Sequence, residues 1–281
     1  MWHQTKFGTY QEMVGILQEP EDFTSEAHYL IVMLPGLGQA MSEKNYLFSN
    51  IRKKLAPLGH TVVQFDYRGH GDSQGELGET SLVTMTEDTL TVIMEMLSRR
   101  SYEKIFLIGN KLGAIVSYLT LHHLERFTPI EKVLISISPP VEKLPQSTEL
   151  FPSLILQKLQ QEGKLDASQL VPGEDYYTLS DFNEAQYNYF ISLGAHMLYL
   201  HGQFISYVLL QQLDHLLLPE VYQTTKREKH FIFGEKDMGN IERTKGLSDV
   251  KTHVIPNITY FFQHPKAMDD LIGKVLDIVN H

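Results

Sequence analysis

Short, uninterrupted apolar runs recur along this chain, separated by longer stretches in which apolar residues return every three or four positions. An apolar run without polar alternation is typical of a strand buried on both faces, as in a parallel sheet. Such runs occupy residues 29–34, 61–65, 105–109, 132–137, 230–234 and 252–255. Residues 6–18 alternate loosely and instead predict an N-terminal hairpin or edge strand.

Helical spacing follows several of these runs. Ser42 is a candidate N-cap for a helix that ends at Gly59, and a second helix is expected over residues 82–100. Pro265 suits the first turn of a C-terminal amphipathic helix. Strands that alternate with helices predict an α/β fold with a mainly parallel sheet, in which sites lie at the C-terminal ends of the strands.

Residues 141–225 break this alternation. They hold Pro, Gln and many tyrosines, show no clean strand pattern, and predict a helical cap inserted between two parts of one core, residues 1–140 and 226–281. Aromatic and methionine side chains of this cap are expected to line the entrance of an apolar pocket. These side chains are Tyr176, Tyr177, Phe182, Tyr187, Tyr189, Phe190, Met197 and Tyr199.

Composition narrows the classes of function. The net charge is −10, from 34 acidic and 24 basic residues, which argues against nucleic acid as a partner because phosphate binding needs a basic surface. The chain has no run of about 18 apolar residues that would predict a membrane span. Residues 1–5 lack the features of a signal peptide. The absence of cysteine suits a reducing cytoplasm, where we expect the protein to reside.

The sequence predicts neither a metal site nor an organic cofactor. His196 and His201 are five positions apart, a poor spacing for one helix face, and no carboxylate shares a ligand spacing with them. His70 is interpreted as a residue that orders its loop. The oligomeric state, including a homo-oligomer, stays open.

The stretch that organises the chain runs from the apolar strand at residues 105–109 into a helical pattern. Gly109 and Gly113 stand two residues before and two residues after Lys111. This is the layout of a nucleophile elbow, in which a strand turns sharply into a helix and presents one side chain at the sheet edge. The flanking positions must be small because the strand, turn and helix backbones press together there.

Four further segments extend the pattern, in the chain order of one family. Residues 35–38 follow the first buried strand, and residues 66–73 read Asp-x-Arg-Gly-x-Gly-x-Ser. Residues 234–237 and 261–264 end in an acid and a histidine. Together they resemble the α/β hydrolases, and within them the branch of monoacylglycerol lipases and serine aminopeptidases. This resemblance implies the α/β-hydrolase fold, a parallel sheet with a helical cap.

The resemblance also implies a role for each matching residue. Asp237 and His264 would be the acid and the histidine of the triad, and the backbone N–H groups of Leu37 and Leu112 would form the oxyanion hole. The sequence departs from the family at the nucleophile, where Lys111 stands in place of serine, and at position 35, where proline stands in place of the usual histidine.

Lysine cannot complete the serine cycle. A neutral amine that attacked an ester would leave an amide, which water does not release, and a lysine amine is ordinarily protonated because its reference pKa is about 10.4. Three roles remain for Lys111. It could anchor a ligand without turnover, form a Schiff base with a carbonyl compound, or bind a carboxylate or oxyanion while His264 and Asp237 act as the base.

Two hypotheses follow. In the first, the protein binds a small acyl or carbonyl compound in an apolar pocket under the cap and lacks ester turnover. In the second, it is an unorthodox hydrolase or lyase that uses the His264–Asp237 pair with Lys111. Another nucleophile, Ser73 or Ser42, is a third route, although Ser73 is better interpreted as a turn residue. If the His264–Asp237 pair is intact, Lys111→Ser is predicted to have partial esterase activity.

Overall fold

The structure, a computed structural model, describes residues 1–20, 28–170, 182–195, 204–223 and 225–280. Several residues singled out above lie outside these ranges, so the structure does not test the interpretations that rest on them. They are Tyr176, Tyr177, His196, Met197, Tyr199 and His201.

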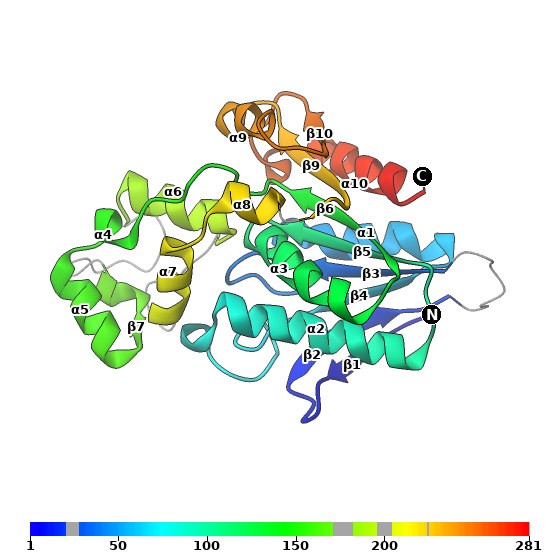
Figure 1. The fold of residues 1–281 in the computed structure, drawn as a ribbon, viewed down its shortest axis with the longest axis horizontal. Helices are drawn as coiled ribbons and strands as arrows, with labels where there is room; N and C mark the ends of the chain where they lie inside the picture. The colour runs from blue at the N-terminus through cyan, green and yellow to red at the C-terminus, as the bar shows by residue number, and fades with distance from the viewer. Residues whose placement is uncertain (21–27, 171–181, 196–203, 224, 281) are drawn as a thin grey trace.

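One large sheet forms the centre of the molecule (Figure 1). Among the described residues it has eight strands in the order β1-β2-β4-β3-β5-β6-β9-β10. Strands β1 and β2 form the predicted N-terminal antiparallel hairpin, β2 is also antiparallel to β4, and all other neighbours are parallel. The bounds are β1 (Trp2–Phe7), β2 (Met13–Gln18), β3 (Tyr29–Leu34), β4 (Thr61–Phe65), β5 (Lys104–Asn110), β6 (Glu131–Ile137), β9 (Glu228–Gly234) and β10 (Val250–Ile255).

Helices cover both faces of the sheet, which explains the continuous apolar runs. Leu30 and Val32 of β3 pack in one core with α2 (Leu82–Arg99) and α3 (Leu112–Phe127). Ile31 belongs to a second core, with α1 (Leu47–Leu55) and α10 (Pro265–Asn280). Because each face is buried, every second residue does not need to be polar. The predicted α/β fold is confirmed.

The remaining short elements of the core lie in its connections. They are the 3₁₀ helices η1 (Lys44–Tyr46), η2 (Ala56–Leu58), η3 (Leu77–Glu79) and η6 (Phe261–Gln263), and the helix α9 (Met238–Thr244).

The chain between β6 and β9, residues 138–227, is called the insertion below. Figure 1 shows it as a separate group of elements at one end of the sheet. Its elements are α4 (Ser147–Leu150), α5 (Ser153–Glu162), β7 (Lys164–Asp166), η4 (Ala167–Leu170), α6 (Glu184–Leu193), β8 (Phe204–Ser206), α7 (Tyr207–Asp214) and α8 (Leu218–Gln223). The short antiparallel pair β7–β8 was not expected, because three residues are too few to show a strand pattern.

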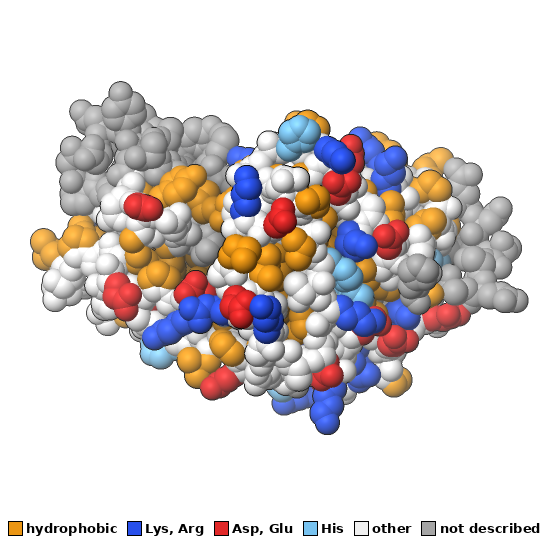
Figure 2. Space-filling model, turned by 90° about the horizontal axis from the view of Figure 1, so that it is seen from above, with side chains coloured by type: hydrophobic (Ala, Val, Ile, Leu, Met, Phe, Trp, Pro, Cys, Tyr) orange, Lys and Arg blue, Asp and Glu red, His pale blue; other side chains and the backbone are white. Residues whose placement is uncertain are grey.

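The surface carries no field of a single sign on the face seen in Figure 2. Acidic and basic side chains are interspersed there with hydrophobic ones, over the core and over the described part of the insertion. In the described part of the chain, no helix is long and apolar enough to cross a membrane.

Candidate functional site

Lys111 occupies the sharp turn between β5 and α3. Its backbone has φ +51° and ψ −110°, outside the regions that L-residues ordinarily adopt, and its N–H donates to Ile137 O at 2.9 Å. A Cβ added to Gly109 would lie 2.4 Å from Gly113 O, and one added to Gly113 would lie 1.9 Å from Leu34 O. The requirement for small residues on both sides of Lys111 is therefore confirmed.

The Lys111 amine is buried against the insertion. Only 1% of the residue is exposed, Nζ donates to Ile191 O at 2.5 Å, and Nζ lies 4.0 Å from the centroid of the Tyr260 ring. Burial lowers the Lys111 pKa to about 7, although the charges of Asp237 and Glu43 oppose the shift. An amine in this position is partly neutral near pH 7 and is held by the C-terminal end of α6.

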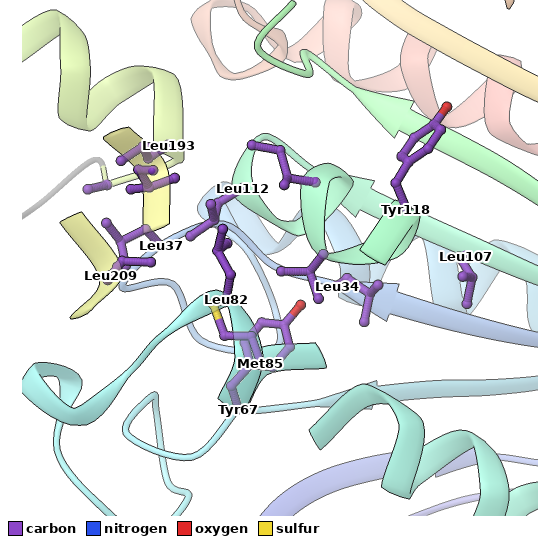
Figure 3. Packing of buried hydrophobic residues seen from close by; sticks show 14 of the residues in the cluster. Leu34, Leu37, Tyr67, Leu82, Met85, Leu107, Leu112, Tyr118, Leu193 and Leu209 are labelled. Carbon is purple, nitrogen blue, oxygen red and sulfur yellow. The ribbon is translucent and has the colours of Figure 1, made fainter. Parts of the chain in front are cut away.

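The Leu37 N–H, predicted to be half of the oxyanion hole, also contacts the insertion. It donates to Leu193 O at 2.9 Å. The two backbones meet closely, since a Cβ on Gly36 would lie 2.9 Å from the Gly194 Cα. Figure 3 shows the Leu37 and Leu193 side chains beside each other, with Leu112 nearby, within one buried hydrophobic cluster. Two carbonyl oxygens at the end of α6 therefore accept hydrogen bonds from the Lys111 amine and from the Leu37 amide, the predicted oxyanion-hole donor.

Asp237 follows β9 and is half-buried near this site. Its two carboxylate oxygens accept hydrogen bonds from the Asn240 side-chain amide at 3.0 and 3.2 Å. Burial raises the Asp237 pKa, while the Asn240 hydrogen bonds and the Lys111 charge lower it. Asp237 thus acts on Lys111 through its charge rather than through a direct ion pair.

His264 forms no hydrogen bond or ion pair with Asp237 or Lys111 among the described residues, so the His264–Asp237 pair stays a prediction. The imidazole is exposed, and its Nδ1 accepts from Lys266 N at 3.1 Å, at the start of α10. It lines a separate cavity of about 260 Å³ together with Asn257 and Asp270. The ring that reaches Lys111 belongs to Tyr260, four residues earlier. Burial raises the Tyr260 pKa to about 12, so this phenol stays protonated.

Glu43 is a buried residue that the sequence did not point to. Its carboxylate accepts from Gly36 N at 2.8 Å and from Lys44 N at 2.9 Å, so it fixes the loop that carries Leu37. Burial raises the Glu43 pKa, whereas the hydrogen bonds from Gly36 and Lys44 and the charge of Lys111 lower it. The sequence predicted a helix cap at Ser42 instead, and this prediction is wrong, because the N-cap of η1 is Glu43 and that of α1 is Tyr46.

The Ser73 hydroxyl forms two hydrogen bonds with the backbone. Its hydroxyl donates to Asp66 O at 2.7 Å and accepts from Val14 N at 2.8 Å. These contacts tie the loop after β4 to β2 and agree with the interpretation of Ser73 as a turn residue. Within the described residues, no group of three or more His, Asp or Glu side chains is arranged to hold a metal ion.

A family model matches the chain over residues 25–173, more than half of its length, and its description is "Serine aminopeptidase, S33". The chain belongs to the serine aminopeptidase S33 family. This membership and the fold confirm the resemblance to α/β hydrolases.

One lipase and two solved structures illustrate what this S33 family member is similar to. The chicken (Gallus gallus) lysophosphatidylserine lipase ABHD12 is 33% identical over 116 residues, which cover 41% of this chain and 29% of the chicken protein. Mouse α/β hydrolase domain-containing protein 10 superposes with a TM-score of 0.65 at 16% identity, over 99% of this chain and 98% of that one.

A third solved structure, of Est1E from Butyrivibrio proteoclasticus with ferulic acid bound, gives a TM-score of 0.62 at 16% identity. The superposition covers 96% of each chain. At such identities, these superpositions establish the shared fold alone.

Proposed function

We propose that this protein is a member of a hydrolase family that binds a small acyl or carbonyl compound without orthodox ester turnover. Lys111 takes the position of the nucleophile serine in this proposal. A serine hydrolase needs a free hydroxyl, a histidine beside it and unoccupied amide donors for the oxyanion. The turn after β5 holds an amine, the ring next to it is Tyr260, and the Leu37 amide is already bonded to Leu193 O.

The observation that carries the proposal is the double contact of α6 with the elbow. Ile191 O accepts from the Lys111 amine, and Leu193 O accepts from the Leu37 amide. Two carbonyl oxygens of the chain itself thus lie where the carbonyl of an acyl compound would be received. A ligand with a carbonyl group would replace these contacts with equivalent ones, which is why we assign this ligand class.

The surroundings favour an apolar ligand body. Leu37, Leu112, Leu193 and Leu209 gather next to the turn (Figure 3), so a ligand that moved the end of α6 would meet leucine side chains. A pocket that opened among these side chains would bind a ligand mainly through apolar contact, while a few polar groups would fix its orientation. The amine of Lys111 and the amide of Leu37 would be those polar groups.

A second candidate activity is the formation of a Schiff base at Lys111. It is favoured by one observation, the lowering of the Lys111 pKa to about 7, because only a neutral amine attacks a carbonyl carbon. In this step the nitrogen forms a double bond to that carbon, and the carbonyl oxygen leaves as water. The amine would first have to leave Ile191 O.

A panel of p-nitrophenyl esters tests the main proposal, with Lys111→Met as the matched control that keeps an unbranched side chain without the amine. We expect both proteins to hydrolyse the esters at the background rate. Wild-type turnover that disappears in Lys111→Met would overturn the proposal. Ligand binding is followed separately by the thermal shift that short acyl and carbonyl compounds produce in the two proteins.

Borohydride reduction in the presence of short aldehydes and ketones tests the second candidate. It should leave a stable secondary amine on Lys111, which mass spectrometry of the digested protein locates. If no adduct forms on Lys111 while surface lysines are labelled, the Schiff-base route fails and the binding proposal is unaffected.

A further inference from the structure

A polar cavity of about 380 Å³ lies where the glycine-rich loop after β4 meets the insertion. Its wall is formed on the core side by Gly38 and by parts of residues 69–77, and on the insertion side by Phe204 of β8. Neither Lys111 nor Tyr260 belongs to the lining. The volume is within the range of small-molecule sites in proteins, roughly 300–1,000 Å³.

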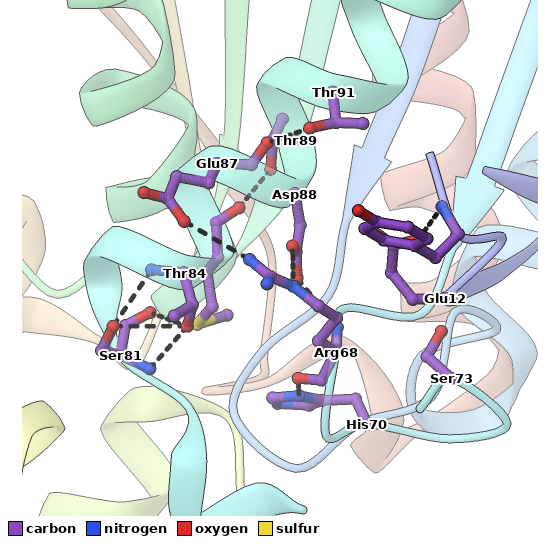
Figure 4. Close-up of polar contacts among 12 residues, drawn as sticks. Glu12, Arg68, His70, Ser73, Ser81, Thr84, Glu87, Asp88, Thr89 and Thr91 are labelled. Carbon is purple, nitrogen blue, oxygen red and sulfur yellow. Dashed lines mark hydrogen bonds and ion pairs between the residues drawn. The ribbon is translucent and has the colours of Figure 1, made fainter. Parts of the chain in front are cut away.

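His70, one of the lining residues, carries an unsatisfied hydrogen-bond acceptor. The residue is 3% exposed, and its Nδ1 pairs with Arg68 O at 3.5 Å (Figure 4). Because a carbonyl oxygen only accepts, this contact assigns the ring proton to Nδ1. The Nε2 atom is buried and has no hydrogen-bond partner within the described part of the chain.

The imidazole stays neutral at physiological pH. Burial lowers the His70 pKa to about 4, and the carbonyl of Arg68 opposes that shift only in part. Nε2 therefore carries no proton at pH 7, and leaving a buried acceptor without a partner has a desolvation cost. A ligand hydroxyl or N–H group that donates to Nε2 would remove this cost.

The glycines of the wall add hydrogen-bond donors. Across the described residues, the backbone N–H groups of Gly38, Gly71 and Gly75 have no hydrogen-bond partner. Gly71 has φ +49°, and a Cβ there would lie 2.2 Å from Asp66 Oδ2, so no larger residue fits this part of the wall. A wall that offers both donors and an acceptor suits a ligand with hydroxyl groups, because each hydroxyl can donate and accept hydrogen bonds.

The charges around the cavity favour a neutral ligand. Glu76 is the charged residue of the lining, and its carboxylate forms an ion pair with Lys164 at 2.5 Å. Because Lys164 neutralises Glu76, the described lining carries no net charge of its own, and the chain as a whole has a net charge of −10. A neutral ligand therefore fits this wall better than a phosphate or carboxylate group does. Phe204 and Leu77 supply apolar surface beside the polar groups.

We propose that this cavity binds a neutral polyhydroxylated molecule, such as a sugar ring, with a ligand hydroxyl donating to His70 Nε2 and the C–H face of the ring against Phe204. The site is separate from Lys111, and the proposal does not depend on the function proposed above. No covalent step is involved.

The test uses the full chain and methyl β-D-glucopyranoside as the probe. Backbone amide NMR shifts measure the affinity in every variant, and shifts of the His70 ring nitrogens report the contact in the proteins that keep His70. His70→Phe keeps an aromatic ring against Tyr67 and removes the acceptor, while Phe204→Ala removes the apolar wall. His264→Phe is the matched control, because His264 is exposed and lines a different cavity. Circular dichroism verifies that each variant is folded.

We expect saturable binding by the wild type and by His264→Phe. Affinity should fall by about tenfold or more in His70→Phe and several-fold in Phe204→Ala, as expected when a buried hydrogen bond or an apolar wall is lost. Inorganic phosphate should not bind. Wild-type shifts that never saturate would show a cavity filled with water only and would overturn the proposal. Equal affinity in His70→Phe and the wild type would overturn it as well. If His70→Phe does not fold, unchanged affinity in Phe204→Ala decides against it.

Discussion

The Nζ atom of Lys111 lies 4.0 Å from the centroid of the Tyr260 ring, so an ammonium group and an aromatic face meet where the resemblance to α/β hydrolases predicts a hydroxyl and an imidazole. A cation over a ring face is stabilised by about 0.5–2 kcal/mol, depending on desolvation. The same amine donates to Ile191 O. Both contacts support the binding role proposed for Lys111.

Lys111 should make the stability of the protein depend on pH. Its folded-state pKa of about 7 is below the ordinary value of 10.5, so between those two pH values the unfolded chain binds more protons. Stability relative to Lys111→Met should therefore rise as the pH increases from about 7 to about 10, by up to about 5 kcal/mol. Below pH 7 the difference should be constant. Chemical denaturation of both proteins across this range measures it, and a flat difference would contradict the burial of the amine.

Restoring esterase activity should require two substitutions. The sequence suggested that Lys111→Ser alone would be partly active, but the ring at the site is Tyr260 and His264 is exposed at the start of α10. We expect Lys111→Ser and Tyr260→His to be inactive singly. The double variant should hydrolyse p-nitrophenyl acetate at least about tenfold faster, because His then accepts the hydroxyl proton.

Addition of Asp237→Asn to that double variant is the control, and the gain should be lost. If Lys111→Ser alone is as active as the double variant, the assignment of Tyr260 to the histidine position is wrong.

The close approach of Gly36 and Gly194 predicts a local effect of Gly194→Ala. Gly194 has φ +108°, and a Cβ there would lie 2.8 Å from the Gly36 Cα. The substitution should destabilise the protein by about 1–3 kcal/mol and speed amide exchange at Leu37. Gly163→Ala is the matched control, since Gly163 has φ +78° and nothing within 4 Å of an added Cβ. Equal losses would show that the contact contributes nothing beyond backbone strain.

Glu43 should tune the Lys111 amine. Its charge raises the Lys111 pKa, and so does that of Asp237. Glu43→Gln removes the charge and keeps an oxygen that accepts from Gly36 N, so the loop should persist while the Lys111 pKa falls further below about 7. The ¹³Cε shift of Lys111 as a function of pH reports this change. An unchanged titration midpoint would show that the charge of Glu43 does not influence the Lys111 pKa. The same measurement on Asp237→Asn shows how much the second carboxylate contributes.

The sheet could be predicted from the sequence because a strand buried on both faces needs a continuous run of apolar residues. Residues 29–34 and 61–65 are the bounds of β3 and β4, and the glycines around Lys111 follow from backbone contacts within a few residues. Such signals are local. They require no knowledge of which distant segments meet.

The site was only partly predictable for the opposite reason. Lys111 meets Ile191 across 80 positions in sequence, and no local pattern encodes that contact. In the loop after β10, Tyr260 and His264 are both plausible site residues by spacing. The structure separates them because Pro265 begins α10 and His264 accepts from the first turn of that helix, leaving Tyr260 to face the elbow.

The most direct measurement of the central claim is the pKa of the Lys111 amine itself. Its ¹³Cε resonance can be assigned by its absence in Lys111→Met and followed by NMR as the pH is raised. A buried amine held by Ile191 O and Tyr260 predicts a titration midpoint near 7. A midpoint above about 10, the value of a lysine in water, would place the amine in solvent and contradict the account.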